Sequence, residues 1–383
     1  MTIATDISAP RTPEPLGPAG PARRPTGAAC RPAGIRSGAA ERRAPRPGVA
    51  DCPKTMVDGP CGGVRSDGGC ETGDRPCAFV GPGAAAPRTR PVGRVPLAAP
   101  AAALLGVLDA RPLIVAELPS SGPDPDELRR TAGVLAGHVD AALLGDAPWA
   151  RVQLPPALRA TLVAAEGVRP WASLNCRDRN RVALEGELAG LAAAGVAAVH
   201  CVTGDHPLTG GRPDALPVFD LDAVALAALA AGSGLAVSVA ESPSAPPADE
   251  RPARAARKAA AGADVVIVNH AGDEDALGAF VVATRALAPA LRILVSVPLV
   301  CSTAGARRLE AFLPGAVPAD VLAALDAPDP TAAAVDRAIA AAGRALAVDG
   351  VAGVDLSGVA GPGEEPVVAA ALAWVGADLG GGS

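Results

Sequence analysis

Short apolar runs recur along the chain, separated by segments long enough to form helices. Eight of these runs have the length and the Val, Leu and Ile content of buried parallel strands: residues 113–118, 139–144, 168–174, 196–202, 235–240, 265–268, 293–297 and 351–356. The segments between them are rich in Ala and Leu, as at residues 126–136, 220–231, 251–261 and 330–348. This alternation over residues 99–383 predicts an α/β fold, a (β/α)8 TIM barrel. The alternative is an open doubly wound sheet, which usually carries a Gly-rich dinucleotide fingerprint that this chain lacks.

One strand–helix–strand unit, at residues 171–207, has polar clusters at both strand ends. Its first strand leads into the cluster at 177–181 and then into a helix with apolar residues at helical spacing, Leu184, Leu188 and Leu191. Its second strand stops at residues 203–207, which read TGDHP. Catalytic groups of parallel barrels gather at the carboxyl ends of the strands, where the loops are free to vary. The two clusters are therefore the first candidates for a site.

The chain before the barrel divides into three segments by composition. Residues 1–50 contain nine Pro and six Gly and almost no large apolar side chain, which predicts a disordered Pro/Arg-rich tail. Residues 51–80 form a Cys-rich segment, and residues 81–98 read as a Pro/Gly/Ala linker. The sequence therefore predicts one large domain preceded by a small module and a tail.

Four of the eight cysteines lie close together in the small module: Cys52, Cys61, Cys70 and Cys77. A segment with so few core residues needs a disulfide or a metal site to stabilise its fold. Four thiolates between Gly-rich turns can bind one zinc ion or one iron–sulfur cluster. Their spacing matches neither zinc ribbons nor ferredoxins, so the choice between the two metals stays open. Two disulfides or free thiols are the alternative, but in a reducing compartment such a cluster more often binds metal.

The charge distribution excludes some classes of partner. The net charge is -6, and the first 50 residues carry eight Arg against three acidic residues, so the body is more acidic than the whole. It has no basic surplus for a phosphate backbone, which argues against nucleic acid. No apolar run reaches the ~20 residues that cross a bilayer, and no export signal is present. We therefore expect a cytoplasmic protein without a membrane partner.

Several motifs resemble those of the methylenetetrahydrofolate reductase family. In the barrel they are AELPSS at 116–121, LNCRDRNR at 174–181, VTGDHP at 202–207 and KAAAGAD at 258–264. The Cys-rich module resembles a small domain that is C-terminal in some of these reductases and a separate companion protein in others. Its CPK, GPCGG and CE elements and a following Cys stand at 52–54, 59–63, 70–71 and 77. In this chain the module precedes the barrel.

The resemblance implies an enzyme that reduces 5,10-methylenetetrahydrofolate to 5-methyltetrahydrofolate with NAD(P)H, through FAD, in one-carbon and methionine metabolism. Glu117 stands at the position of the family's acid, which protonates N10 and opens the substrate ring, a role that suits a carboxyl group in an apolar setting. Asp205 is the implied anionic partner of the pterin and of the cation formed on it. Asn269 stands where a pterin-binding Gln is typical. The implied cofactor-binding residues are Arg177, Thr203, Gly204, Asp205, His206 and Lys258.

The chain departs from the family pattern at two strand ends. Glu241 stands where a small or aromatic neutral residue is expected near a flavin, and Asn269 is shorter than Gln. A flavin-free variant would pass hydride directly from nicotinamide to folate. A rival from another class is a non-catalytic folate-binding or electron-transfer subunit that uses the Cys module as an adaptor for a partner redox protein. A third is a methyl-transfer barrel that uses folate without redox chemistry. We also expect a homo-oligomer.

Overall fold

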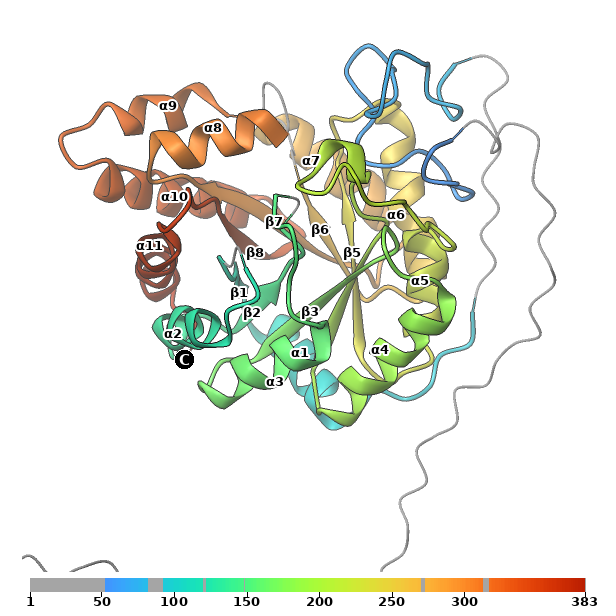
Figure 1. The fold of residues 1–383 in the computed structure, drawn as a ribbon, viewed down its shortest axis with the longest axis horizontal. Helices are drawn as coiled ribbons and strands as arrows, with labels where there is room; N and C mark the ends of the chain where they lie inside the picture. Colours follow the sequence, from blue (N-terminus) through green and yellow to red (C-terminus); the bar gives the residue numbers. More distant parts are fainter. Residues whose placement is uncertain are drawn as a thin grey trace, which may run out of the picture. The chain divides into compact units, whose positions relative to one another are not determined.

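The structure is a computed structural model that describes residues 52–81, 92–119, 122–147, 149–269, 273–312 and 317–382. Within these residues, eight parallel strands close into a barrel in sequence order (Figure 1). They are β1 (Leu113–Glu117), β2 (Ala141–Leu144), β3 (Pro170–Asn175), β4 (Ala198–Val202), β5 (Ala236–Glu241), β6 (Val265–Val268), β7 (Arg292–Leu299) and β8 (Val351–Gly358). The predicted TIM barrel is thus confirmed. The predicted tail, residues 1–50, and most of the predicted linker, residues 82–91, lie outside the described residues.

Helices lie outside the strands and cover the barrel (Figure 1). They are α1 (Ala99–Ala110), α2 (Pro125–Leu135), α3 (Pro156–Ala165), α4 (Arg181–Ala193), α5 (Ala223–Ala230), α6 (Arg251–Ala260), α7 (Glu274–Leu287), α8 (Thr303–Phe312), α9 (Ala319–Leu325), α10 (Pro330–Ala347) and α11 (Glu365–Asp378). Several begin at a residue whose side chain accepts a backbone N–H of the first turn, as at Asp124, Asn180, Asp222, Asp273 and Asp329. None of the helices in the described part of the chain has the length and hydrophobicity to cross a membrane.

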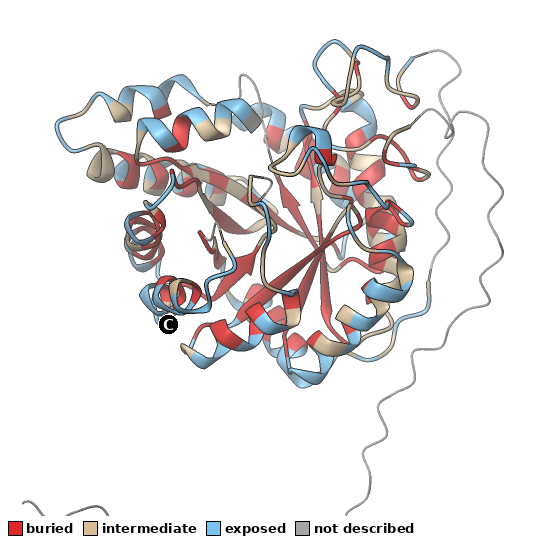
Figure 2. Ribbon diagram, viewed as in Figure 1, coloured by how far each residue is buried: buried red, intermediate tan, exposed pale blue. Residues whose placement is uncertain are grey.

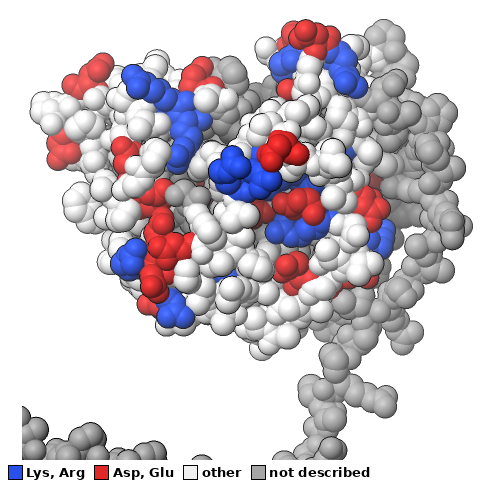
Figure 3. Space-filling view, viewed as in Figure 1, with Lys and Arg blue, Asp and Glu red and all other residues white. Residues whose placement is uncertain are grey.

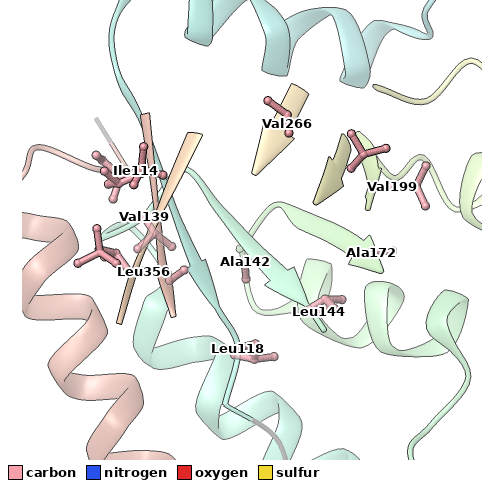
Figure 4. Close-up of a cluster of buried hydrophobic side chains, with 14 of the residues drawn as sticks. Ile114, Leu118, Val139, Ala142, Leu144, Ala172, Val199, Val266 and Leu356 are labelled. Carbon is pink, nitrogen blue, oxygen red and sulfur yellow. The ribbon is translucent and has the colours of Figure 1, made fainter. Parts of the chain in front are cut away.

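Strand alternation divides the apolar core into two layers. Ile114 and Ala116 of β1 face outward and belong to the layer that packs with the helices, for example with Leu128 of α2. Figure 4 shows part of this outer layer, with side chains contributed by several strands. The strands are therefore buried on both faces, and the exposed residues lie on the outer sides of the helices (Figure 2).

The inner layer fills the amino end of the barrel. Leu113 and Val115 of β1 face inward and pack in one cluster with Trp171 of β3 and the buried Leu side chains of α1. The segment 92–98 passes the same end, where the Ala98 N–H donates to the Gly234 carbonyl at 2.8 Å. Because this end is filled, a site is expected at the opposite, carboxyl end of the strands.

The Cys-rich module consists of turns, with one isolated antiparallel bridge between Gly69 and Pro76. Its buried apolar side chains are Met56, Val64 and Phe79. A core of this size buries little surface, as expected from the sequence, so contacts with the barrel stabilise the module.

Candidate active site at the carboxyl ends of the strands

Two of the predicted site residues lie on the inner face of the barrel at its carboxyl end. Glu117 is the last residue of β1 and shares a face with Val115 of the inner layer. Asn269 follows β6 and shares a face with the inward-facing Ile267. The strand pattern therefore places a carboxyl group and an amide at the same end of the barrel interior.

Glu117 is a half-buried carboxyl group, and the described residues place no cationic partner beside it. Its Oε2 accepts a hydrogen bond from the Ser357 hydroxyl of β8 at 2.8 Å. Burial raises the pKa of Glu117 above its usual value, and the hydrogen bond from Ser357 opposes this only in part. A carboxyl group whose pKa is raised in this way is suited to the role of a general acid.

A second carboxyl group, that of Asp355, lies near Glu117 and was not predicted. It is fully buried on β8, and neither of its oxygens has a hydrogen-bond partner in the part of the chain that the structure describes. Burial and the neighbouring Glu117 raise the pKa of Asp355 well above its usual value. An acidic residue in the middle of the apolar run 351–356 is the sequence signal that could have identified it.

The loop after β4 requires glycine at position 204. Gly204 has a φ of +86°, and a Cβ there would lie 3.0 Å from the Cβ of Asn175 and 3.2 Å from that of Arg177. The preceding Thr203 is buried and its hydroxyl accepts the Ala223 N–H at 3.1 Å, which ties the loop to the start of α5. Both residues shape the loop that presents Asp205.

His206 also has a structural role in this loop. Its Nδ1 accepts the Leu208 N–H at 3.3 Å, and its ring stacks on Phe219 with 5.9 Å between ring centroids. Burial and the cation of Lys54 lower the pKa of His206, so the ring is neutral at neutral pH. The sequence favoured this structural role for His206 over an acid or base.

The charge around Asp205 comes partly from the Cys module. Burial raises the pKa of Asp205 and Glu71 adds to this, whereas Lys54 and Arg177 oppose it. Lys54 and Glu71 form an ion pair at 2.6 Å, and Glu71 also accepts the His206 N–H at 3.1 Å. The module therefore contacts the loop of the candidate site, which no local sequence pattern indicated.

The module is held on the barrel mainly by Asp222, the first residue before α5. Its Oδ2 accepts the N–H groups of Val57 and Asp58, both at 3.1 Å, while its Oδ1 caps α5 through the Ala225 N–H. The Thr55 hydroxyl donates a further hydrogen bond to the Phe219 carbonyl. A single buried carboxylate thus stabilises the module and the start of α5 together.

The four module cysteines are free thiols that line one small cavity of about 20 Å³. Burial raises the pKa of Cys52 and Cys77, and the other cysteines add to it. In the described residues, no group of three or more His, Cys, Asp or Glu side chains is arranged to hold a metal ion. As arranged, the thiols thus do not form a metal site, and the predicted metal and partner redox protein stay predictions.

Arg177 lines a cavity of about 250 Å³ between the loops after β2, β3 and β4. Three other Arg side chains line it too, and they alternate with acidic ones: Asp146, Arg151, Asp178, Arg179 and Arg212. Figure 3 shows basic and acidic side chains side by side on the face drawn there. The Arg side chains give this opening the donors for a carboxylate or phosphate group.

Glu241 does not face the barrel interior, contrary to the expectation that it lies near a flavin. It lies on the outer side of β5, fully buried, where its carboxylate contacts Arg251 at 3.2 Å, Arg254 at 2.8 Å and Lys258 at 2.9 Å. Burial opposes its ionisation, but the three cations hold the pKa of Glu241 well below its usual range. Three cations on one face of α6, at spacings of three and four, are the sequence signal for such an acid.

The comparison with known families accounts for both parts of the chain. Residues 150–361, more than half of the chain, match the family model described as methylenetetrahydrofolate reductase. The chain belongs to the methylenetetrahydrofolate reductase family. Residues 46–87 match a second model, methylene-tetrahydrofolate reductase C terminal. Both resemblances seen in the sequence are confirmed, whereas no curated protein matches the chain.

Two solved structures are similar to this chain over about 70% of its length. An uncharacterized protein from Clostridium thermocellum, described as binding two copies of 5-methyl-5,6,7,8-tetrahydrofolic acid, is 11% identical with a TM-score of 0.52 over 70% of this chain and 96% of that one. The EDTA monooxygenase EmoA from Chelativorans sp. BNC1 is 14% identical with a TM-score of 0.46 over 71% of this chain and 95% of that one. At 11% identity, the likeness to the Clostridium thermocellum protein shows the fold alone.

The reductase family implies FAD as the cofactor, but one residue predicted to bind it is not accessible in this structure. The Lys258 ammonium, predicted to contact a flavin, is buried and donates to the Ala240 carbonyl and to Glu241. Arg251 of the same cluster donates to the Cys61 carbonyl of the module at 3.2 Å, so the module covers these cations. The phosphates of a flavin would reach them only after the module had moved. As arranged, Lys258 does not fit its predicted role as a contact of FAD.

Proposed function

We propose that this protein reduces 5,10-methylenetetrahydrofolate to 5-methyltetrahydrofolate with hydride from NAD(P)H. Family membership supports a folate substrate, as does the folate bound by the Clostridium thermocellum protein of the same fold. The observation that carries the proposal is the pair of environments at the carboxyl end. Burial raises the pKa of Glu117, which has no cationic partner among the described residues, whereas the cations of Lys54 and Arg177 oppose the effect of burial on the pKa of Asp205.

Ring opening is the step assigned to Glu117. Its carboxyl proton passes to N10 of the substrate, the bond between N10 and the bridging carbon breaks, and a 5-iminium cation forms. Hydride from NAD(P)H adds to that carbon and gives the 5-methyl group. Glu117 is left as a carboxylate and regains its proton from water. A well-placed general acid accelerates such a step by ~10²–10⁴-fold.

Asp205 and Asn269 are proposed to bind the pterin. The Asp205 carboxylate can accept hydrogen bonds from the amino and amide donors of the pterin, and its charge stabilises the iminium cation. Asn269 offers an amide on the inner face. The Arg-lined cavity beside Arg177 has the charge to receive the glutamate carboxylates of the folate. This arrangement accounts for the pterin and for the anionic tail of the substrate.

The direct test is turnover in Glu117→Gln, measured as NAD(P)H oxidation that depends on methylenetetrahydrofolate. We expect a loss of ~10²-fold or more, because Gln has no proton to give. Glu274→Gln is the matched control, since Glu274 is an exposed residue of α7 outside the site. A rate unaffected by Glu117→Gln would eliminate Glu117 as the acid. Wild-type protein that binds 5-methyltetrahydrofolate without oxidising NAD(P)H would instead support the non-catalytic folate-binding subunit.

Cofactor and metal content are proposed separately from the acid chemistry. We propose direct hydride transfer from NAD(P)H, because Lys258, the lysine predicted to contact a flavin, is buried in the cluster at Glu241. We also propose that the four cysteines, which share one cavity, bind zinc or an iron–sulfur cluster after rearrangement. The absorption spectrum of anaerobically purified protein, with metal analysis of the same sample, tests both. A stoichiometric flavin band would refute direct transfer, and absence of metal would refute the metal module.

A further inference from the structure

We propose that the Cys module completes the candidate site, in which its Glu71 is a positioning residue that holds the backbone of Asp205. The proposal rests on the proposed reductase function, because Asp205 is the residue assigned there to the pterin. The sequence indicated a metal site and an adaptor for a partner protein in this module. The role proposed here is a different one, in substrate binding by the chain itself.

The decisive contact lies on the peptide group that joins Asp205 to His206. Oε1 of Glu71 accepts the His206 N–H at 3.1 Å. This N–H belongs to the peptide group whose orientation is set by the ψ angle of Asp205, because a peptide group is planar and rotates as one unit. The hydrogen bond therefore restricts the backbone of Asp205, and with it the direction in which the carboxylate points.

The barrel fixes the loop on the other side of Asp205. The Thr203 hydroxyl accepts the Ala223 N–H at 3.1 Å, and the Thr203 carbonyl accepts the Cys176 N–H at 3.1 Å. The next residue, Gly204, has a φ of +86° that turns the chain toward Asp205. Asp205 thus lies between one residue that the barrel fixes and one that the module holds.

Three sequence elements of the module converge on the Glu71 side chain, which comes from the CE element. Lys54 of the CPK element forms an ion pair with the same Oε1 at 2.6 Å. Gly63, the last residue of the GPCGG element, lies against the other oxygen, and a Cβ there would be 1.7 Å from Oε2. One element therefore supplies the hydrogen-bond acceptor, the second supplies its cationic partner, and the third leaves the space that the carboxylate occupies.

The surroundings of Glu71 strengthen its contact with the loop. The Glu71 side chain keeps 13% of its exposure and the Lys54 side chain keeps 6%, so water competes little for the carboxylate. A hydrogen bond from a backbone N–H to an ionised group is about twice as strong as one between neutral groups. Lys54 also offsets the negative charge of Glu71, which would otherwise repel the carboxylate of Asp205.

The first measurement is the dissociation constant of 5-methyltetrahydrofolate, obtained by equilibrium dialysis with the full chain. Glu71→Ala removes the acceptor, and we expect binding to weaken by ~10-fold or more, because displacement of a binding group by about 1 Å is enough for such a loss. Glu71→Gln keeps Oε1 and should restore most of the affinity. Asp74→Ala removes an exposed acidic residue of the same module and is the matched control, which should bind as the wild type does.

Equal affinity of the wild type and Glu71→Ala overturns the proposal, and so does a Glu71→Gln variant that binds as weakly as Glu71→Ala. Weaker binding by Glu71→Ala, in a protein whose wild type oxidises no NAD(P)H, upholds the positioning role and refutes the proposed reaction. A wild type that does not bind 5-methyltetrahydrofolate at all overturns both.

The second measurement moves the Glu71 carboxylate without removing it. Gly63→Ala directs a Cβ at Oε2, so the carboxylate must shift, whereas a Cβ at Gly73 in the same module meets no atom within 4 Å. We expect ~10-fold weaker binding of 5-methyltetrahydrofolate by Gly63→Ala and none of this loss in Gly73→Ala. Limited proteolysis of both variants reports whether the module stays folded on the barrel. Equal affinity of the two variants, or a loss that appears only with a module that has become protease-sensitive, overturns the specific role of Glu71.

Discussion

Replacement of Glu241 by Gln tests the role of the buried charge cluster beneath the Cys module. The substitution keeps the size and shape of the side chain and removes its negative charge. Glu241 is the anion that Arg251, Arg254 and Lys258 share within the described residues of this cluster, and its side chain is fully buried. Gln can still accept hydrogen bonds through one oxygen, but the three buried cations lose the carboxylate that they share.

The expected loss in the free energy of unfolding is about 3–5 kcal/mol, the range found when one partner of a buried ion pair is removed. It is limited because Lys258 can release its proton. Burial and the cations of Arg254 and Arg251 already lower the pKa of Lys258 to about 7, although Glu241 opposes them. Without Glu241 this pKa falls further, so the deficit should grow as pH falls below about 7 and shrink above it.

Urea unfolding of the wild type and of Glu241→Gln at pH 6 and pH 8 measures this loss. Glu274→Gln is the matched control, since it removes the same charge from an ion pair between two exposed side chains, Glu274 and Arg344. The control should change stability by less than about 0.5 kcal/mol. A loss in Glu241→Gln as small as that of the control would refute the buried cluster. It would also restore the expectation that Glu241 faces a cofactor.

Two further substitutions test the loop and the attachment of the module. Gly204→Ala places a Cβ at positive φ against Asn175 and should cost about 1–3 kcal/mol of stability. Its control is Gly186→Ala on α4, where a Cβ would meet no atom within 4 Å, and this change should stabilise the protein by up to about 1 kcal/mol. Thermal unfolding compares the two variants, and equal effects would refute the backbone strain at Gly204. Asp222→Asn turns an amide donor toward the N–H groups of Val57 and Asp58 and should cost about 1–3 kcal/mol and speed proteolysis of the module. Asp273→Asn is its control, because Asp273 is an exposed residue that caps α7 through one hydrogen bond from the Ala276 N–H. Similar proteolysis of both variants would contradict the role of Asp222 in attaching the module to the barrel.

The fold could be predicted because its signal is local and repeated. The strands of this barrel are buried on both faces, so they appear as apolar runs, and each of the eight runs overlaps one strand of the structure. Glu117 and the loop at 203–205 could be predicted for a related reason. They follow such runs directly, and the carboxyl ends of parallel strands meet at one end of the barrel.

The rest of the site depends on contacts between residues far apart in the sequence, and the pattern of apolar runs does not reveal such contacts. Glu71 meets the loop at His206 across 135 positions of the chain, and Asp222 meets Asp58 across 164. The direction in which a side chain points at the end of a strand was also not predictable from the sequence. Glu241 follows Ala240 at the carboxyl end of β5, and a shift of one position along a strand turns a side chain from the interior to the helices.

These contacts make the Cys module part of the site. Three of the module's polar groups near the site lie at a cysteine or within two residues of one in the sequence. Lys54 is two residues after Cys52, Glu71 directly follows Cys70, and the carbonyl that Arg251 binds is that of Cys61 itself. Whatever fixes the backbone at the cysteines also fixes the ion pair beside Asp205. The geometry of the thiols and the charge at the candidate pterin site are therefore set by one segment, although they belong to different parts of the fold.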